Sequence, residues 1–197
     1  MRTRSAGVPR MDPAEKEREL LELCRRSPEV GFARLHARYL PLVWALCLKV
    51  LDSQAWAEDA CQECFVRIWA GLSDFRGDSK LSTWIWTLSH RCILNLAQRE
   101  SRGERRASRR DELDEHAPTL PDTGRSAADE LERKDLLDRL LGELSPAQRS
   151  IVTLFYMQEL SVAEVAGITG QSDGAVRVTL HRARQRMAMA ARALEEK

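Results

Sequence analysis

The chain has 197 residues, of which 43% are hydrophobic and 31% are charged, and its formal net charge is +1. This hydrophobic fraction is enough to build packed cores and argues against a wholly disordered chain. No stretch approaches the roughly 20 apolar residues of a membrane span, no secretory signal pattern is present, and the five cysteines are not spaced as a disulfide framework. We therefore expect a cytoplasmic protein of one ordinary or two small domains.

Charge is segregated along the chain although the total is nearly balanced. Residues 1–110 carry a net charge of +6, residues 111–144 carry −7 and residues 145–197 carry +2. Two basic blocks separated by an acidic one suggest two surfaces that could meet a polyanion. Charge alone favours the simpler interpretation of solvated helix faces and a charged linker.

The first part of the chain has the periodicity of helices. The helix start at Asp12–Glu15 predicts a helix to about Arg26. A second helix should open at Ser27–Pro28, and Pro41 is expected to kink or restart it. The apolar pattern then predicts a third helix over about 54–71.

The polar loop 73–80 separates this helix from a fourth, expected over about 82–99. Residues 100–125 lack periodicity and carry arginines, then acidic residues, then proline and glycine, which is typical of a flexible linker. Helical pattern returns at Ala127, and Ser145 opens a further helix.

These features predict an all-α fold of two small helical domains joined by a flexible linker. The predicted boundaries are residues 1–27 for an N-terminal arm and first helix, 28–100 for the first domain, 101–126 for the linker and 127–197 for the second domain.

Residues 162–169 and 174–186 have the proportions of a helix-turn-helix. The second helix alternates packing residues with long polar ones, so Arg177, His181 and Arg184 fall on or near one outward face. A helical hairpin with a basic solvated face would share part of this pattern. The capping box at the first helix, the glycine-containing turn and the arginine face together favour DNA binding.

These segments resemble a known family. Residues 144–152 (LSPAQRSIV), 160–166 (LSVAEVA) and 174–184 (GAVRVTLHRAR) closely resemble region 4 of the extracytoplasmic-function (ECF) sigma factors. Upstream, residues 57–69 (AEDACQECFVRIW) and the stretch from Phe75 to Ile85 resemble region 2 of the same family. Two motif groups in the family's order are far more specific than either alone.

The resemblance implies a dissociable initiation subunit that docks on bacterial RNA polymerase and directs it to particular promoters. Region 2 would bind the polymerase clamp and open the −10 element, and region 4 would sit on the polymerase flap and read the −35 element. The resemblance implies no cofactor, leaves catalysis to the polymerase, and makes control by an anti-sigma factor an expectation.

Polar residues of the 54–71 helix lie largely off its apolar stripe, which suits docking to a partner that is later released. By resemblance we assign clamp contact to Asp59, Gln62, Glu63, Arg67 and Trp69.

The loop 73–80 and the helix after it combine aromatic and cationic side chains, which can stack on and neutralise single-stranded DNA. Trp84 is expected to belong mostly to the core, and Trp86 is the better candidate for DNA contact. By resemblance we assign the −10 contacts to Phe75, Arg76, Lys80, Trp86, His90, Arg91, Asn95 and Arg99.

The outward face of the last helix is assigned to the −35 element. Val178 and Thr179 stand where the family usually has polar or basic groups, so an unusual −35 sequence preference is expected. Arg91 and Asn95 likewise replace the family's usual Asn and Asp. The assigned −35 contacts are Arg177, Val178, Thr179, His181, Arg182 and Arg184.

Cys61 and Cys64 form a C-x-x-C pair, and Cys24, Cys47 and Cys92 lie in the same half of the chain. A zinc or redox-sensing site is therefore conceivable. The pair falls on the apolar helix face, however, so we expect buried thiols that act as small hydrophobes and no metal.

No catalytic constellation is present: the sequence has no phosphate-binding glycine loop, no metalloprotease helix and no nucleophile elbow. We therefore expect a protein that is not an enzyme. An alternative is a helix-turn-helix repressor or activator that acts without polymerase docking, although such a protein has no need of the docking helix and the aromatic-cationic loop. A third is an interaction protein that sequesters a partner, which would leave the arginine face unexplained.

Overall fold

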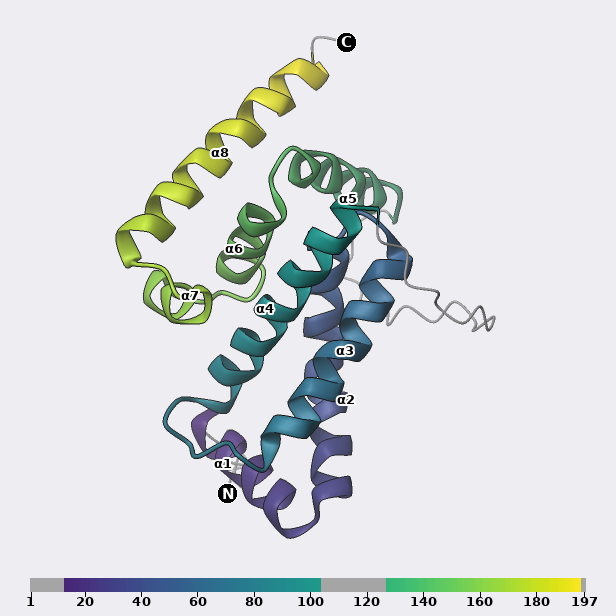
Figure 1. Ribbon diagram of the computed structural model, residues 1–197. Coiled ribbons are helices and arrows are strands. Elements are labelled where there is room, and N and C mark those ends of the chain that lie inside the picture. The colour runs from purple at the N-terminus through teal and green to yellow at the C-terminus, as the bar shows by residue number, and fades with distance from the viewer. Residues whose placement is uncertain (1–12, 104–126, 196–197) are drawn as a thin grey trace, which may run out of the picture.

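The computed structural model describes residues 13–103 and 127–195, and within these ranges all regular structure is α-helical (Figure 1). The all-α prediction is confirmed. Residues 1–12 and all but the first three residues of the predicted linker lie outside the described ranges. The helices of the N-terminal half are α1 (Pro13–Arg26), α2 (Pro28–Val50), α3 (Gln54–Leu72) and α4 (Leu81–Ser101), and those of the C-terminal half are α5 (Ala127–Gly142), α6 (Pro146–Tyr156), α7 (Val162–Thr169) and α8 (Asp173–Glu195).

In the N-terminal half, α2, α3 and α4 pack side by side, and α1 lies across α2 (Figure 1). The apolar stripe of α3 is fully buried from Ala57 to Ile68, as its spacing predicts. The crossing of α1 and α2 depends on Gly31, because a Cβ at this position would lie 2.4 Å from the Cα atom of Cys24. No other residue type permits backbones to approach so closely.

Helix α2 runs without a break from Pro28 to Val50, so it does not restart at Pro41, and the kink stays a prediction. Proline removes one backbone N–H and leaves the carbonyl four residues earlier without its helical partner. Both Pro41 and Ala37, which carries that carbonyl, are at least partly accessible to solvent. Water can therefore satisfy the freed carbonyl, while the buried face of the helix continues on either side.

The C-terminal half contains the predicted helix-turn-helix, formed by α7 and α8. The Ser161 hydroxyl accepts a hydrogen bond from the backbone N–H of Glu164, and the Glu164 side chain accepts one from the backbone N–H of Ser161. Gly170 ends α7 with φ of 70°, a left-handed conformation that glycine adopts at little cost. An equivalent capping box, Ser145 with Gln148, opens α6.

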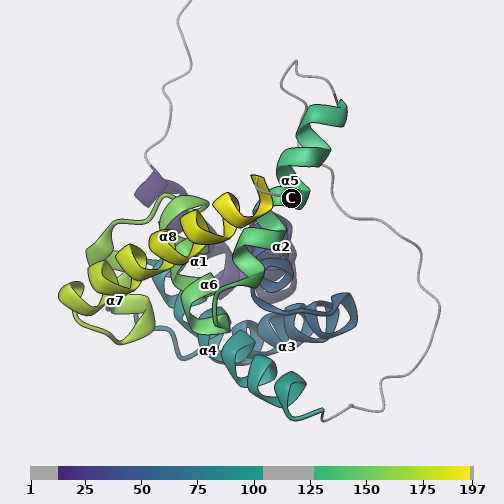
Figure 2. The same cartoon turned by 90° about the horizontal axis from the view of Figure 1, so that it is seen from above.

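The two halves pack against each other. Helix α4 contacts α6 and α7, and α2 contacts α6, so that α8 lies on the far side of α6 and α7 from α4 (Figures 1 and 2). One cluster of buried apolar residues runs through both halves, from Leu35 and Ile85 to Val165. At its edge, His90 of α4 and Ser150 of α6 share a buried hydrogen bond of 2.8 Å between Nδ1 and Oγ.

The burial of His90 predicts a pH dependence of stability. Desolvation, followed by the charge of Arg91, lowers the pKa of His90 from its ordinary 6.5 to about 4. Between these values the unfolded chain binds a proton that the folded chain excludes, so the free energy of unfolding should fall as pH drops from 6.5 to 4, by up to about 3 kcal/mol. Urea unfolding at a series of pH values measures this slope. His90→Gln should flatten it and His181→Gln, at an exposed histidine, should not; equal slopes for wild type and His90→Gln would contradict the argument.

Candidate nucleic-acid and partner-binding surfaces

The face of α8 that points away from the rest of the molecule is basic. Val176, Leu180 and Ala183 are buried against the other helices of the C-terminal half. The positions between them are exposed or half-buried, as their helical spacing requires. The exposed set contains Arg177, Val178, His181, Arg182 and Arg184, and Thr179 is half-buried.

This face can contact the major groove of a DNA duplex. Arg177, His181 and Arg184 follow each other at intervals of four and three residues, so they lie along one side of the helix. Arginines there can donate to guanine edges or to phosphates. Arg177 forms a 3.8 Å ion pair with Asp173 on the same helix, and such an exposed pair is weak enough to exchange for a phosphate.

The outer face of α3 forms a second surface. Gln62, Arg67 and Trp69 are exposed there, and Asp59 and Glu63 are half-buried. Arg67 donates to the Glu63 carboxylate one turn earlier, and this bond raises the pKa of Arg67.

Two apolar side chains accompany these polar groups. Trp69 is 43% exposed and packs edge-to-face on Phe32 of α2, with ring centroids 4.7 Å apart. Val66, which sequence reasoning missed, is 66% exposed between Gln62 and Trp69. Its position off the buried stripe is the signal that could have identified it. The surface is therefore a mixed apolar and polar patch, as suits a releasable interface.

The loop between α3 and α4 holds its aromatic residue inside and its cations outside. Phe75 is buried against Trp84, with ring centroids 5.1 Å apart. Arg76 and Lys80 are exposed. Along α4, Arg91 and Asn95 are exposed and Arg99 is half-buried, whereas Trp86 and His90 are buried. Trp84 is the more exposed of the two tryptophans, which reverses the order expected from the sequence.

Two of the predicted −10 residues contact the C-terminal half. Lys80 donates to the Glu164 carboxylate of α7 over 3.0 Å, and His90 bonds to Ser150. The Glu164 carboxylate accepts from the backbone N–H of Ser161 and from Lys80, and these bonds lower its pKa to about 2.

Arg149 of α6 joins the two halves at a second place. It is 8% exposed, and its guanidinium donates to the backbone carbonyls of Leu144 and Gly142 in its own half. It also donates to the Asp52 carboxylate and, over 3.4 Å, to the Val50 carbonyl at the end of α2. Lys49 of α2 pairs with Asp138 of α5 nearby. Sequence reasoning gave none of these residues an interdomain role, because their partners lie about 90 or more positions away.

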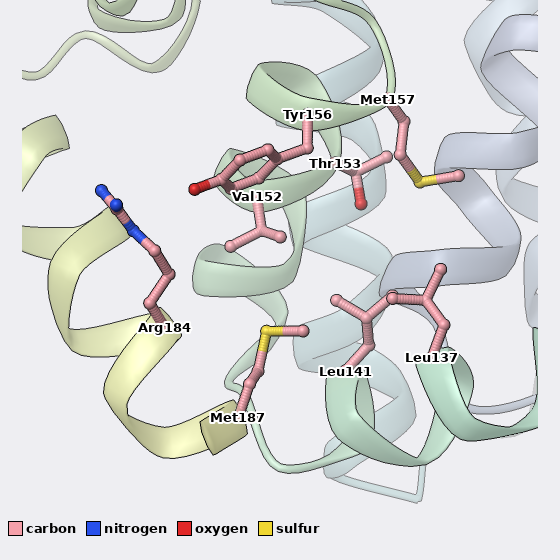
Figure 3. Close-up of a pocket in the computed structure, with 8 residues that line it drawn as sticks. All are labelled: Leu137, Leu141, Val152, Thr153, Tyr156, Met157, Arg184 and Met187. Carbon is pink, nitrogen blue, oxygen red and sulfur yellow. The ribbon is translucent and has the colours of Figure 1, made fainter. Parts of the chain in front are cut away.

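A groove of about 330 Å³ opens between α5, α6 and α8, and sequence reasoning missed it as well (Figure 3). Tyr156 and Met157 are 49% and 43% exposed at its edge. The buried Thr153 hydroxyl, also in its lining, has no hydrogen-bond partner among the described residues. Exposed apolar side chains around a groove are typical of a site for a partner's apolar surface. The lining residues are Leu137, Leu141, Val152, Thr153, Tyr156, Met157, Arg184 and Met187.

The five cysteines are buried free thiols. Burial raises the pKa of Cys24, and hydrogen bonds with Cys61 and Cys64, followed by burial, raise that of Cys47. Within residues 13–103 and 127–195, no group of three or more His, Cys, Asp or Glu side chains is arranged to hold a metal ion.

None of the described helices is long and apolar enough to cross a membrane.

Comparison with known proteins identifies the family of the chain. The sequence matches the family models "Sigma-70 region 2" over residues 35–103 and "Sigma-70, region 4" over residues 134–187. It is 34% identical over 131 residues to the RNA polymerase sigma factor YlaC of Bacillus subtilis, which covers 65% of this chain and 73% of YlaC. It is 22% identical to the ECF sigma factor SigW of the same organism, over 82% of this chain and 89% of SigW.

Two solved structures share the fold. CnrH, solved in complex with the cytosolic domain of CnrY, superimposes with a TM-score of 0.65 at 21% identity, over 90% of this chain and 97% of CnrH. The sigma factor RpoE of Bartonella quintana, solved with the anti-sigma factor NepR, gives a TM-score of 0.62 at 24% identity, over 82% and 96% of the two chains. With both consecutive regions matched over more than half of its length, the chain belongs to the sigma-70 family of RNA polymerase sigma factors, in the ECF group.

Proposed function

We propose that this sigma factor reads the two promoter elements with separate surfaces on its two halves. The outward face of α8 would contact the −35 duplex, and the loop 73–80 with the exposed residues of α4 would contact the −10 strand. The single observation that supports this division most strongly is the helix-turn-helix of α7 and α8, which buries Val176, Leu180 and Ala183 and leaves the arginine face exposed.

Two further surfaces are proposed to dock on core polymerase. The patch on α3 around Gln62, Val66 and Trp69 suits the clamp, and the groove between α5, α6 and α8 suits an apolar helix of the flap. The α3 patch mixes apolar and polar groups, whereas the surface of the groove is almost wholly apolar. Used together they give an affinity that neither has alone, while either can still be released.

Initiation is the activity that needs all these surfaces on one chain, and catalysis of RNA synthesis belongs to the polymerase. The protein would therefore work in the cytoplasm, where the polymerase is. Control by an anti-sigma factor is a further part of the proposal. The complex of RpoE with the anti-sigma factor NepR supports it, since RpoE has the same fold.

Adding the purified chain to bacterial core polymerase should produce transcripts from a defined subset of promoters. Run-off transcription over a genome-wide promoter pool, read by sequencing, measures this. The absence of transcripts, together with tight binding of the chain alone to duplex DNA, would instead favour the repressor or activator alternative.

Arg177→Ala should weaken −35 recognition while leaving polymerase docking intact. Loss of one arginine contact to a base edge costs about 1–3 kcal/mol, or roughly 5- to 150-fold in promoter affinity. Promoter binding by the reconstituted holoenzyme measures the loss. Arg192→Ala, which removes an exposed arginine from the last turn of the same helix, is the matched control. If Arg177→Ala abolished polymerase binding instead, α8 would have been assigned wrongly.

Tyr156→Ala should weaken binding to the flap without unfolding the protein, because the side chain lies at the edge of the groove and is half exposed. Loss of an aromatic contact in an apolar interface is expected to reduce affinity roughly tenfold or more. Titration of the factor against a purified flap fragment measures this. Met189→Ala removes a side chain that is 71% exposed and lies outside the groove, so it should have no effect. Equal losses in the two variants would exclude the groove as the flap site.

A further inference from the structure

The centre of the basic face of α8 is occupied by an apolar side chain. Val178 lies two residues from Val176 and two from Leu180, so it is turned by about 200° around the helix axis from each of these buried residues. It therefore points away from the core of the C-terminal half, and it is 48% exposed. His181 and Arg182 follow it by three and four residues and are its exposed neighbours on the helix surface.

Folding does not account for a valine at this position. The side chain is only half buried, and valine is a weaker helix former than alanine, glutamine or arginine. Single exposed apolar residues are common on protein surfaces, but Val178 is surrounded by cations that can contact phosphates. A partner with a purely apolar surface would leave those charges unpaired. The surroundings of Val178 therefore favour a polyanion whose surface also offers an apolar group.

The helix turn before Val178 is open on the same side. Gly174 lies four residues earlier, and its backbone does not have the positive φ that favours glycine. A Cβ added there would meet only the Ser172 hydroxyl, at 4.0 Å, so packing does not require glycine either. The absent side chain leaves space for close approach at the N-terminal end of α8. The N-terminal residues of a recognition helix are those that contact base edges.

The major groove presents one apolar group at the base edges. This group is the methyl group at C5 of a pyrimidine, which thymine always carries and cytosine carries only when methylated. Small apolar side chains contact it in known modes of base recognition. We propose that Val178 selects a 5-methyl pyrimidine in the −35 element, while the surrounding cations bind the backbone and other bases. This inference rests on the proposed function of α8 and adds the chemical group that the helix selects.

The hydrophobic effect sets the expected size of this selection. Burying one methyl group against an apolar side chain changes affinity roughly fourfold. A lost arginine contact to a base edge generally costs more. Val178 therefore adjusts the choice among promoters and is not required for DNA binding as such. Its contribution depends on a single methyl group of the DNA and should disappear with the valine side chain.

The test uses holoenzyme reconstituted from core polymerase and the full chain, on a promoter that it transcribes. Each thymine of the −35 element, on either strand, is replaced in turn by uracil, which removes only the 5-methyl group. At the position that responds, cytosine and 5-methylcytosine are then compared. Promoter affinity is measured for wild type, for Val178→Ala and for the matched control Val30→Ala, which makes the same change at a 60% exposed valine of α2.

We expect wild type and Val30→Ala to lose roughly fourfold in affinity when one particular thymine becomes uracil, and to prefer 5-methylcytosine over cytosine there by a similar factor. Val178→Ala should bind the two members of each pair equally. The proposal is overturned if no thymine responds in wild type, if Val178→Ala keeps the same losses, or if the cytosine pair shows no preference. If none of the holoenzymes bound any promoter, the proposed function itself would fail.

Discussion

Helix α4 carries nine buried residues between Leu81 and Ala97, and one neighbouring helix cannot cover them all. Consecutive buried pairs such as Ile85 with Trp86, and Ser89 with His90, lie about 100° apart around the helix axis, so the buried arc is wide. One side of that arc faces α2 and α3, and the other faces α6 and α7. The position of the C-terminal half follows from the need to cover the second side.

The same helix carries residues proposed to meet DNA. A side chain that interacts with a melted strand has to be accessible at that moment, and His90 and Trp86 are buried while the halves are together. Interdomain packing would therefore compete with the proposed capture of the strand for one surface.

The buried arginine illustrates the physical limits on this arrangement. Removing a guanidinium from water is costly unless acceptors replace the lost hydration. Arg149 has two carbonyls in its own half and a carboxylate and a carbonyl in the other. Because half of these acceptors lie in its own half of the chain, the guanidinium does not depend on the other half for all of its hydrogen bonds.

Much of this protein could be predicted from local sequence. The helices, the capping box at Ser161, the turn at Gly170 and the inward residues of α8 follow from periodicity and capping, which act within a few residues. The continuation of α2 through Pro41 does not follow from local sequence, because whether proline ends a helix depends on whether water can reach the freed carbonyl.

The sequence by itself determined that the chain is helical, that it ends in a helix-turn-helix and that it carries the motifs of a sigma factor, since these are encoded by residues at short, fixed spacing. Only the tertiary structure decided that Lys80 meets Glu164, that His90 meets Ser150, and that a groove forms between α5, α6 and α8. Those contacts join residues 60 or more positions apart or depend on the shape left between packed helices. A local sequence pattern determines neither the distant contacts nor the groove. Both are selected by the free energy gained when whole helix faces are buried against one another.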